Sequence, residues 1–165
     1  MDFYVTKYLG SAFTPELNIG NVIGFLNLFQ DKSGNLFDGQ ITSLPISQGA
    51  PVEIPRLIIE SESQEWKLQL SLQRIDVFFY RKTHWSSGDE IVSPNEFIKF
   101  CIKIFSSFKS FTNTRLQRLA YVTERVGEIQ DGSPSQYIAN RFCKEEYLES
   151  PFNNTKSFEI HSLKK

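Results

Sequence analysis

Apolar and polar residues alternate most strictly in the middle of the chain. Four apolar residues are each separated from the next by one polar residue, namely Trp66, Leu68, Leu70 and Leu72. Strict alternation is typical of a strand with one face on a core and the other in water. The apolar phase then moves by one residue, to Ile75, Val77 and Phe79. Since a one-residue slip turns every side chain over, we predict a tight turn or bulge at residues 72–74.

The strand that precedes this pair is predicted at Leu57–Ile59. It leads through the polar turn Ser61–Gln64, so the three strands form an antiparallel meander. Further upstream, the apolar run Val22–Phe29 is predicted as a strand, and the polar cluster Asp31–Asn35 suits a hairpin loop. Leu36–Ile46 would be the return strand, and residues 1–20 are a candidate irregular arm.

The second half of the chain changes to a helical period. Ser93-Pro94-Asn95-Glu96 is a capping box with proline at the first helical position. Apolar residues follow at offsets of three and four: Phe97, Phe100, Cys101, Ile104, Phe105 and Phe108. This spacing predicts a helix of about five turns with one apolar face.

Three more elements complete the prediction. Thr114–Ile129 is predicted as a long strand, the capping sequence Ser133–Gln136 begins a second helix, and Ser157–Leu163 is predicted as a final strand. The order is strands, helix, strand, helix, strand. We therefore expect one α+β domain over residues 1–165, with a mostly antiparallel sheet and two α-helices packed on one face. The final strand needs a neighbour, so it is a candidate sheet edge for a partner.

Composition narrows the classes of function. The 165 residues carry 18 Lys+Arg and 19 Asp+Glu, a net charge of −1, which argues against bulk coating of nucleic acid or of an anionic membrane. Fifteen Phe and six Tyr exclude a disordered chain. The two cysteines are too few for a disulfide scaffold. No signal peptide or apolar membrane span is visible, so we expect a cytoplasmic protein that does not bind a membrane.

The search for catalytic chemistry finds few candidates. The sequence contains no HExxH, CxxC, GxGxxG, GxxxxGK[ST] or GxSxG motif, so the enzyme classes that use these motifs are not indicated. Cys101 is expected to be a small core hydrophobe, and neither Cys101 nor Cys143 is predicted to be catalytic, because a reactive thiol needs both exposure and a basic neighbourhood. The pair His84-Trp85 in a polar loop could hold a base or a sugar, but a solvated loop is the commoner reading. We predict no catalytic residue, metal or cofactor, and no enzyme.

One metal-dependent alternative is open. Glu53 with the sequence Glu65-Trp66-Lys67 has the composition of a nuclease site, in which two carboxylates and a lysine hold a divalent cation and orient a water. This reading requires Glu53, Glu65 and Lys67 to converge. Surface charge on the meander explains the same residues without a site.

Positive charge gathers in one stretch of the second half. Between residues 98 and 125 a single acid, Glu124, accompanies the basic residues, and the candidates for binding a partner or phosphates are Lys99, Lys103, Lys109, Arg115 and Arg118. Such a set could track a nucleic-acid backbone. We favour an ordinary solvated helix face, or a patch that binds an acidic protein, because no aromatic residues suited to stacking on bases accompany the basic residues on the polar face.

The middle of the chain resembles a group of uncharacterised bacterial proteins. The resemblance rests on Pro55–Glu60, Leu68–Val77, the Phe-rich helix and Leu119–Arg125. In that group a strand pair precedes a helix and a further strand, and its members continue with more strands after the second helix. The resemblance implies no known activity and favours a bacterial or phage accessory protein.

Three functions therefore stay open. The first is a non-enzymatic protein-binding or assembly module that self-associates or binds a partner through a sheet edge. The second is nucleic-acid binding through the basic residues from Lys99 to Arg118. The third is a hydrolase that uses the scattered carboxylates.

Overall fold

The computed structural model describes residues 3–15, 22–45, 51–81 and 92–127. The chain divides into two compact units, of which Tyr4–Val126 is one. The other unit, residues 1–3 and 127–165, lies almost wholly outside the described residues. The predicted second helix from Ser133, the predicted strand Ser157–Leu163 and the pair His84-Trp85 also lie outside them.

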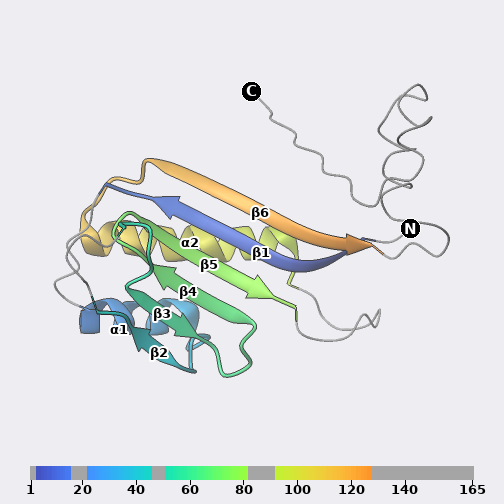
Figure 1. The fold of residues 1–165 in the computed structure, drawn as a ribbon, viewed down its shortest axis with the longest axis horizontal. Coiled ribbons are helices and arrows are strands. Elements are labelled where there is room, and N and C mark those ends of the chain that lie inside the picture. Colours follow the sequence, from blue (N-terminus) through green and yellow to red (C-terminus); the bar gives the residue numbers. More distant parts are fainter. Residues whose placement is uncertain (1–2, 16–21, 46–50, 82–91, 128–165) are drawn as a thin grey trace. The chain divides into compact units, whose positions relative to one another are not determined.

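Six strands and two helices make up the described fold. In chain order they are β1 (Phe3–Phe13), α1 (Val22–Ser33), β2 (Ile41–Ser43), β3 (Leu57–Glu60), β4 (Trp66–Leu70), β5 (Arg74–Tyr80), α2 (Pro94–Thr112) and β6 (Arg118–Gly127). The strands form one antiparallel sheet in the order β2-β3-β4-β5-β1-β6 (Figure 1). The predicted α+β class with a mostly antiparallel sheet is confirmed.

The predicted meander is present as β3, β4 and β5. Buried and half-buried residues alternate along β3 and β4, as the sequence pattern predicts. The turn at residues 71–73 is also present, and it is closed by the Ser71 amide, which donates to the Arg74 carbonyl at 2.8 Å. This turn resets the alternation, so that Ile75, Val77 and Phe79 point to the same core as the apolar residues of β4.

Helix α2 begins with the predicted capping box. The Ser93 hydroxyl accepts from the Glu96 amide at 3.2 Å, and the Glu96 carboxylate accepts from the Ser93 amide at 2.8 Å. These hydrogen bonds from Ser93 hold the pKa of Glu96 below its usual value. The buried face of the helix consists of Phe97, Cys101, Ile104, Phe105 and Phe108. The Phe97 ring lies 5.1 Å from that of Tyr8 and 5.9 Å from that of Trp66, which places α2 against the sheet.

The expectation of an irregular N-terminal arm is wrong for residues 3–13. These residues form β1, which lies between β5 and β6 inside the sheet. A Cβ atom placed on Gly10 would lie 2.5 Å from the Cys101 sulfur, so α2 packs directly on the backbone of β1. A glycine at the centre of a strand hides the alternation by which β1 could be recognised.

The predicted strand at Val22–Phe29 is also wrong, because this run begins helix α1. Phe25 and Phe29 are one turn apart on the helix, and their rings meet edge to face at 4.1 Å. A short apolar run does not distinguish a strand from a buried helix. The cluster Asp31–Asn35 ends α1 rather than forming a hairpin, since Gly34 and Asn35 both adopt the left-handed conformation. The predicted return strand shrinks to the three residues of β2.

Both observed helices pack on one face of the sheet. The Phe25 ring of α1 lies 5.8 Å from the Phe108 ring of α2, and α2 contacts the sheet through Phe97. Figure 1 shows the two helices behind the strands. Helix α1 thus occupies the layer that the sequence pattern assigned to a later helix.

Candidate functional site

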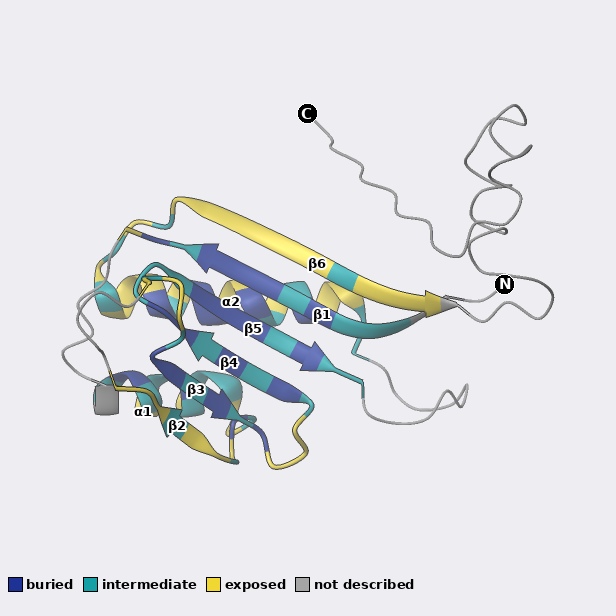
Figure 2. Ribbon diagram, viewed as in Figure 1, coloured by how far each residue is buried: buried dark blue, intermediate teal, exposed yellow. Residues whose placement is uncertain are grey.

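Strand β6 forms a long exposed edge of the sheet. Its neighbour on one side is β1, and no described residue pairs with its other side. Figure 2 shows that the strand is exposed along almost its whole length. Four of its large apolar residues are strongly exposed: Leu119 (59%), Tyr121 (41%), Val122 (53%) and Val126 (42%). Long apolar edges with unpaired backbone groups are surfaces on which another strand can add.

The inner side of β6 is anchored to β1 and to α2. The Gln117 amide donates to the Phe13 carbonyl at 2.8 Å, and the Thr6 hydroxyl donates to the Glu124 carbonyl at 3.2 Å. The Tyr121 ring lies 6.1 Å from that of Tyr8 and 6.0 Å from that of Phe97. Burial, and then the neighbouring Tyr121, raise the pKa of Tyr8. The strand is therefore held by the core, while its outer side stays open in the described part of the chain.

Two charged residues mark the other face of β6. The Arg118 guanidinium lies 4.0 Å from the centre of the Phe13 ring, and the Lys7 ammonium lies 4.0 Å from the Glu124 carboxylate. Phe13 and Lys7 alternate along β1 with Tyr8 and the buried residues that face α2, so Arg118 and Glu124 lie on the face away from the helices. The strand carries opposite charges near its two ends on this face.

That face of the sheet is otherwise a surface of half-buried aromatic rings and paired charges. Phe78 and Tyr80 stack at 5.8 Å, and the Lys7 ammonium lies 5.7 and 5.5 Å from their ring centres. The Lys67 ammonium contacts the Glu60 carboxylate at 2.8 Å. Lys7, Lys67 and Arg74 each contact an acid, so these three basic side chains are neutralised and offer little to a phosphate backbone.

A buried acid fixes the centre of the same face. Asp76 accepts from the Ser11 hydroxyl at 2.5 Å and from the Arg74 guanidinium at 2.7 Å. Burial raises the pKa of Asp76, while the hydrogen bond from Ser11 and the charge of Arg74 lower it. One carboxylate oxygen accepts from Ser11 on β1 and the other from Arg74 on β5, so Asp76 joins the two strands.

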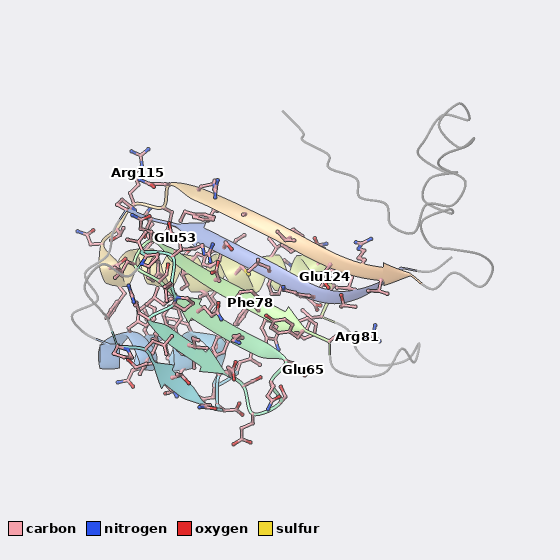
Figure 3. All side chains as sticks on the ribbon, in the orientation of Figure 1. Glu53, Glu65, Phe78, Arg81, Arg115 and Glu124 are labelled. Atoms are coloured by element: carbon pink, nitrogen blue, oxygen red, sulfur yellow. The ribbon has the colours of Figure 1, made fainter. Side chains whose placement is uncertain are left out.

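The five predicted basic residues do not form one surface. Lys99 and Lys103 are exposed one turn apart on α2. Lys109 points in another direction around the helix, and Arg115 lies in the loop after it (Figure 3). Arg118 lies across the sheet, on the face away from α2. The structure brings together only the pair Lys99 and Lys103.

The hypothetical nuclease residues do not converge. Glu65 directly precedes β4, whereas Glu53 follows Val52, which accepts from the Leu72 amide beyond the other end of that strand. Figure 3 shows Glu53 and Glu65 near opposite ends of the meander. Lys67 pairs with Glu60 instead. Among the residues that the structure describes, no group of three or more His, Cys, Asp or Glu side chains could hold a metal ion.

Cys101 is a core residue, as the sequence predicts. Burial raises the pKa of its thiol to about 12, so the thiolate is scarce at neutral pH. A shallow depression between α1 and α2 is lined by Leu28, Lys32, Ser106, Ser107, Ser110 and Phe111. The Ser107 and Ser110 hydroxyls donate to backbone carbonyls of their own helix, which leaves the depression without a convergent set of free donors.

Comparison with known proteins adds no family. The chain matches no family model, no curated protein and no solved structure. The resemblance to uncharacterised bacterial proteins therefore stays a prediction. In the described part of the chain, neither helix combines the length and apolarity needed to cross a membrane.

The sequence pattern named a different strand as the candidate sheet edge, and that strand lies outside the described residues. The sequence pattern predicted the strand at 114–129, which is confirmed as β6, but assigned the sheet edge to Ser157–Leu163. The available signal was Leu119-Ala120-Tyr121-Val122, four apolar residues in a row on a strand. Such a run indicates a strand that is apolar on both faces. It does not say whether both faces are covered.

Proposed function

We propose that this protein is a non-enzymatic protein-binding or assembly module, and that its binding surface is the outer edge of β6. The observation that carries the proposal is the exposure of apolar residues on both faces of a ten-residue edge strand. Strand addition provides backbone hydrogen bonds for affinity and alternate side chains for specificity. The resemblance favours a bacterial or phage complex, and the sequence favours a cytoplasmic location.

The short length of the opposite edge supports this choice of surface. Strand β2 offers three residues and one exposed large apolar side chain, Ile41. A partner strand would gain few hydrogen bonds there. Strand β6 offers more than three times the length, so it is the better template.

Nucleic-acid binding is the alternative, and the separation of its predicted residues weakens it. Only Lys99 and Lys103 share one surface. Two phosphate contacts give little affinity at physiological salt, because affinity grows with the number of phosphates neutralised.

The test is affinity capture with the tagged full-length chain from a native lysate, with and without nuclease. Two variants accompany the wild type: Leu119→Lys with Val122→Lys on the β6 edge, and Lys99→Glu with Lys103→Glu on α2. We expect a partner that survives nuclease, disappears with the edge variant and persists with the α2 variant. Loss of all partners with nuclease and with the α2 variant would contradict the proposal and favour nucleic-acid binding.

A further inference from the structure

We infer that the strand added to β6 is the β6 of a second copy of this chain, so that two copies share a continuous sheet. This inference rests on the proposed function and names its partner. Homodimers through identical edge strands are isologous, because a two-fold axis makes each strand both donor and acceptor of the same pairing. The strands then run antiparallel, which suits a pairing without any connecting loop.

The charge pattern of β6 selects one register. In a two-fold antiparallel pair, a residue some positions before the axis faces the residue the same number of positions after it in the other copy. The two facing side chains lie on the same face of the sheet. With the axis beside Tyr121, Arg118 faces Glu124 of the second copy, and Glu124 faces Arg118 of the second copy. Both residues are exposed and lie on the face away from the helices, so two symmetric ion pairs form.

Neighbouring registers lose this complementarity. Moving the axis to Val122 places Arg118 opposite Val126 and Glu124 opposite Ala120. Moving it to Ala120 places Arg118 opposite Val122. Opposite charges directly across a strand pair stabilise it, and like charges destabilise it. Among registers in which paired residues share a face, the one centred on Tyr121 is the only one that pairs Arg118 with Glu124.

The apolar residues fit the same register. Ala120 faces Val122 of the second copy on the face with the charges, and the two Tyr121 rings meet on the helix face. Tyr121 and Val122 are among the strongly exposed residues of the strand, so the pairing removes apolar surface from water on both faces. The contact is one strand wide, well below the usual area of a stable interface. We therefore expect a concentration-dependent monomer–dimer equilibrium.

Charge variants test the pairing in the purified full-length chain, by sedimentation over a dilution series. Arg118→Glu and Glu124→Arg should each weaken the dimer about tenfold, because each turns two attractive pairs into repulsive ones. An equimolar mixture of the two variants should recover wild-type association, since acid then faces base at both positions. The double variant should recover it too. Lys99→Glu and Glu62→Arg are matched charge changes at other exposed sites and should leave association unchanged.

Cysteine cross-linking tests the register, in a chain with Cys143→Ser so that Cys101, which is buried, is the only native thiol. Facing residues of antiparallel strands lie within the Cα separation that a disulfide spans. Tyr121→Cys should cross-link with itself. Val122→Cys should not cross-link with itself but should cross-link with Ala120→Cys when the two are mixed. Ala120 and Val122 are exposed, so the mixed cross-link between them still reports the register even if replacing Tyr121 disturbs the packing.

Each contrary outcome has a distinct meaning. A chain that is monomeric at every concentration overturns the inference, whether its edge is free or covered by another segment of the same chain. Cross-linking in another register overturns it as well. If a monomeric chain still captures a different protein and loses it with the Leu119→Lys and Val122→Lys variant, the proposed function stands without self-pairing. If the Leu119→Lys and Val122→Lys variant captures the same proteins as the wild type, the proposed function itself is wrong.

Discussion

The two edges of the sheet differ in length and in how their backbone is used. Strand β2 has three residues, and the chain on either side of it is bound to the meander: the Gly39 amide donates to Glu60 and the Leu44 amide to Arg56, both at 2.9 Å. Strand β6 has ten residues, and no described residue pairs with the outer side of either edge strand. A short edge with its ends tied down offers little to a partner strand, whereas a long edge offers a whole ladder.

Side chains reinforce the difference. Before β2, the Asp38 carboxylate accepts from the Glu62 amide at 2.9 Å and so holds this part of the chain against the β3–β4 turn. At the β6 edge, apolar side chains stand exposed on both faces. The β2 edge is short and has little exposed apolar surface, whereas the β6 edge is long, apolar and suited to association. The difference between the two edges can be tested by substitutions at either edge, or at the contact between β1 and β5 that lies between them.

The largest effect is expected from Gly39→Ala, in the chain just before β2. A Cβ atom there would lie 2.6 Å from the Ser61 carbonyl carbon and 2.7 Å from the Glu62 nitrogen. These are backbone atoms of the β3–β4 turn, so the clash can be relieved only by moving the turn. We expect a loss of about 2 kcal/mol in the free energy of unfolding, measured by urea denaturation.

Gln40→Ala is the matched control for this variant. Gln40 is exposed, and its backbone carbonyl still accepts from the Glu60 amide after substitution. Its unfolding free energy should stay close to that of the wild type. A Gly39→Ala protein as stable as this control would show that the chain before β2 is not packed tightly against the turn.

The next effect concerns the contact between β1, which carries β6, and β5, which ends the meander. Ser11→Ala removes the hydroxyl that donates to the buried Asp76 carboxylate. We expect a loss of about 1–2 kcal/mol at neutral pH, because the hydrogen bond is to a charged group. The loss should shrink as pH falls through the folded-state pKa of Asp76, which burial places above 3.8, since the protonated acid needs the donor less.

Urea unfolding of wild type and Ser11→Ala at stepwise lower pH measures this dependence. The Ser11 hydrogen bond lowers the pKa of Asp76, so its removal raises that pKa further. Because only the ionised form loses the bond's stabilisation, the loss of stability is greatest at high pH and falls as the pH is lowered. Ser106→Ala, an exposed helical control, should show no such pH dependence. A Ser11→Ala loss that is constant with pH would mean that Asp76 is not the group affected.

The parts of the fold that were predictable are those specified by neighbours in the sequence. The meander follows from a period of two with a phase change at residues 72–74, and α2 follows from the Ser93 capping box and a helical apolar period. Strand β1 and helix α1 were missed for local reasons as well. Gly10 interrupts the alternation of β1, and the short apolar run at Val22–Phe29 suits a strand and a helix equally.

The position of the candidate surface was not predictable in this way, because strand order is a long-range property. The pattern of Leu119–Val122 indicates a strand but not that the strand is last in the sheet. The separation of the basic residues was unpredictable for a related reason. Lys103 and Arg118 are close in sequence, but the chain turns from the helical layer into the sheet between them, and Arg118 then faces the other way.

The smallest effect on stability is expected at the open edge. Val122→Lys replaces a strongly exposed side chain, so the unfolding free energy of the monomer should change by less than about 0.5 kcal/mol. The same variant should have a large effect on association. Association is visible in thermal unfolding, because the midpoint temperature of a dimer rises with protein concentration. We expect this rise in the wild type and its loss in Val122→Lys, measured by thermal unfolding at low and high concentration. Ile41→Lys, the equivalent change at the β2 edge, should keep the rise; if both variants lose it or neither does, the two edges are not functionally different.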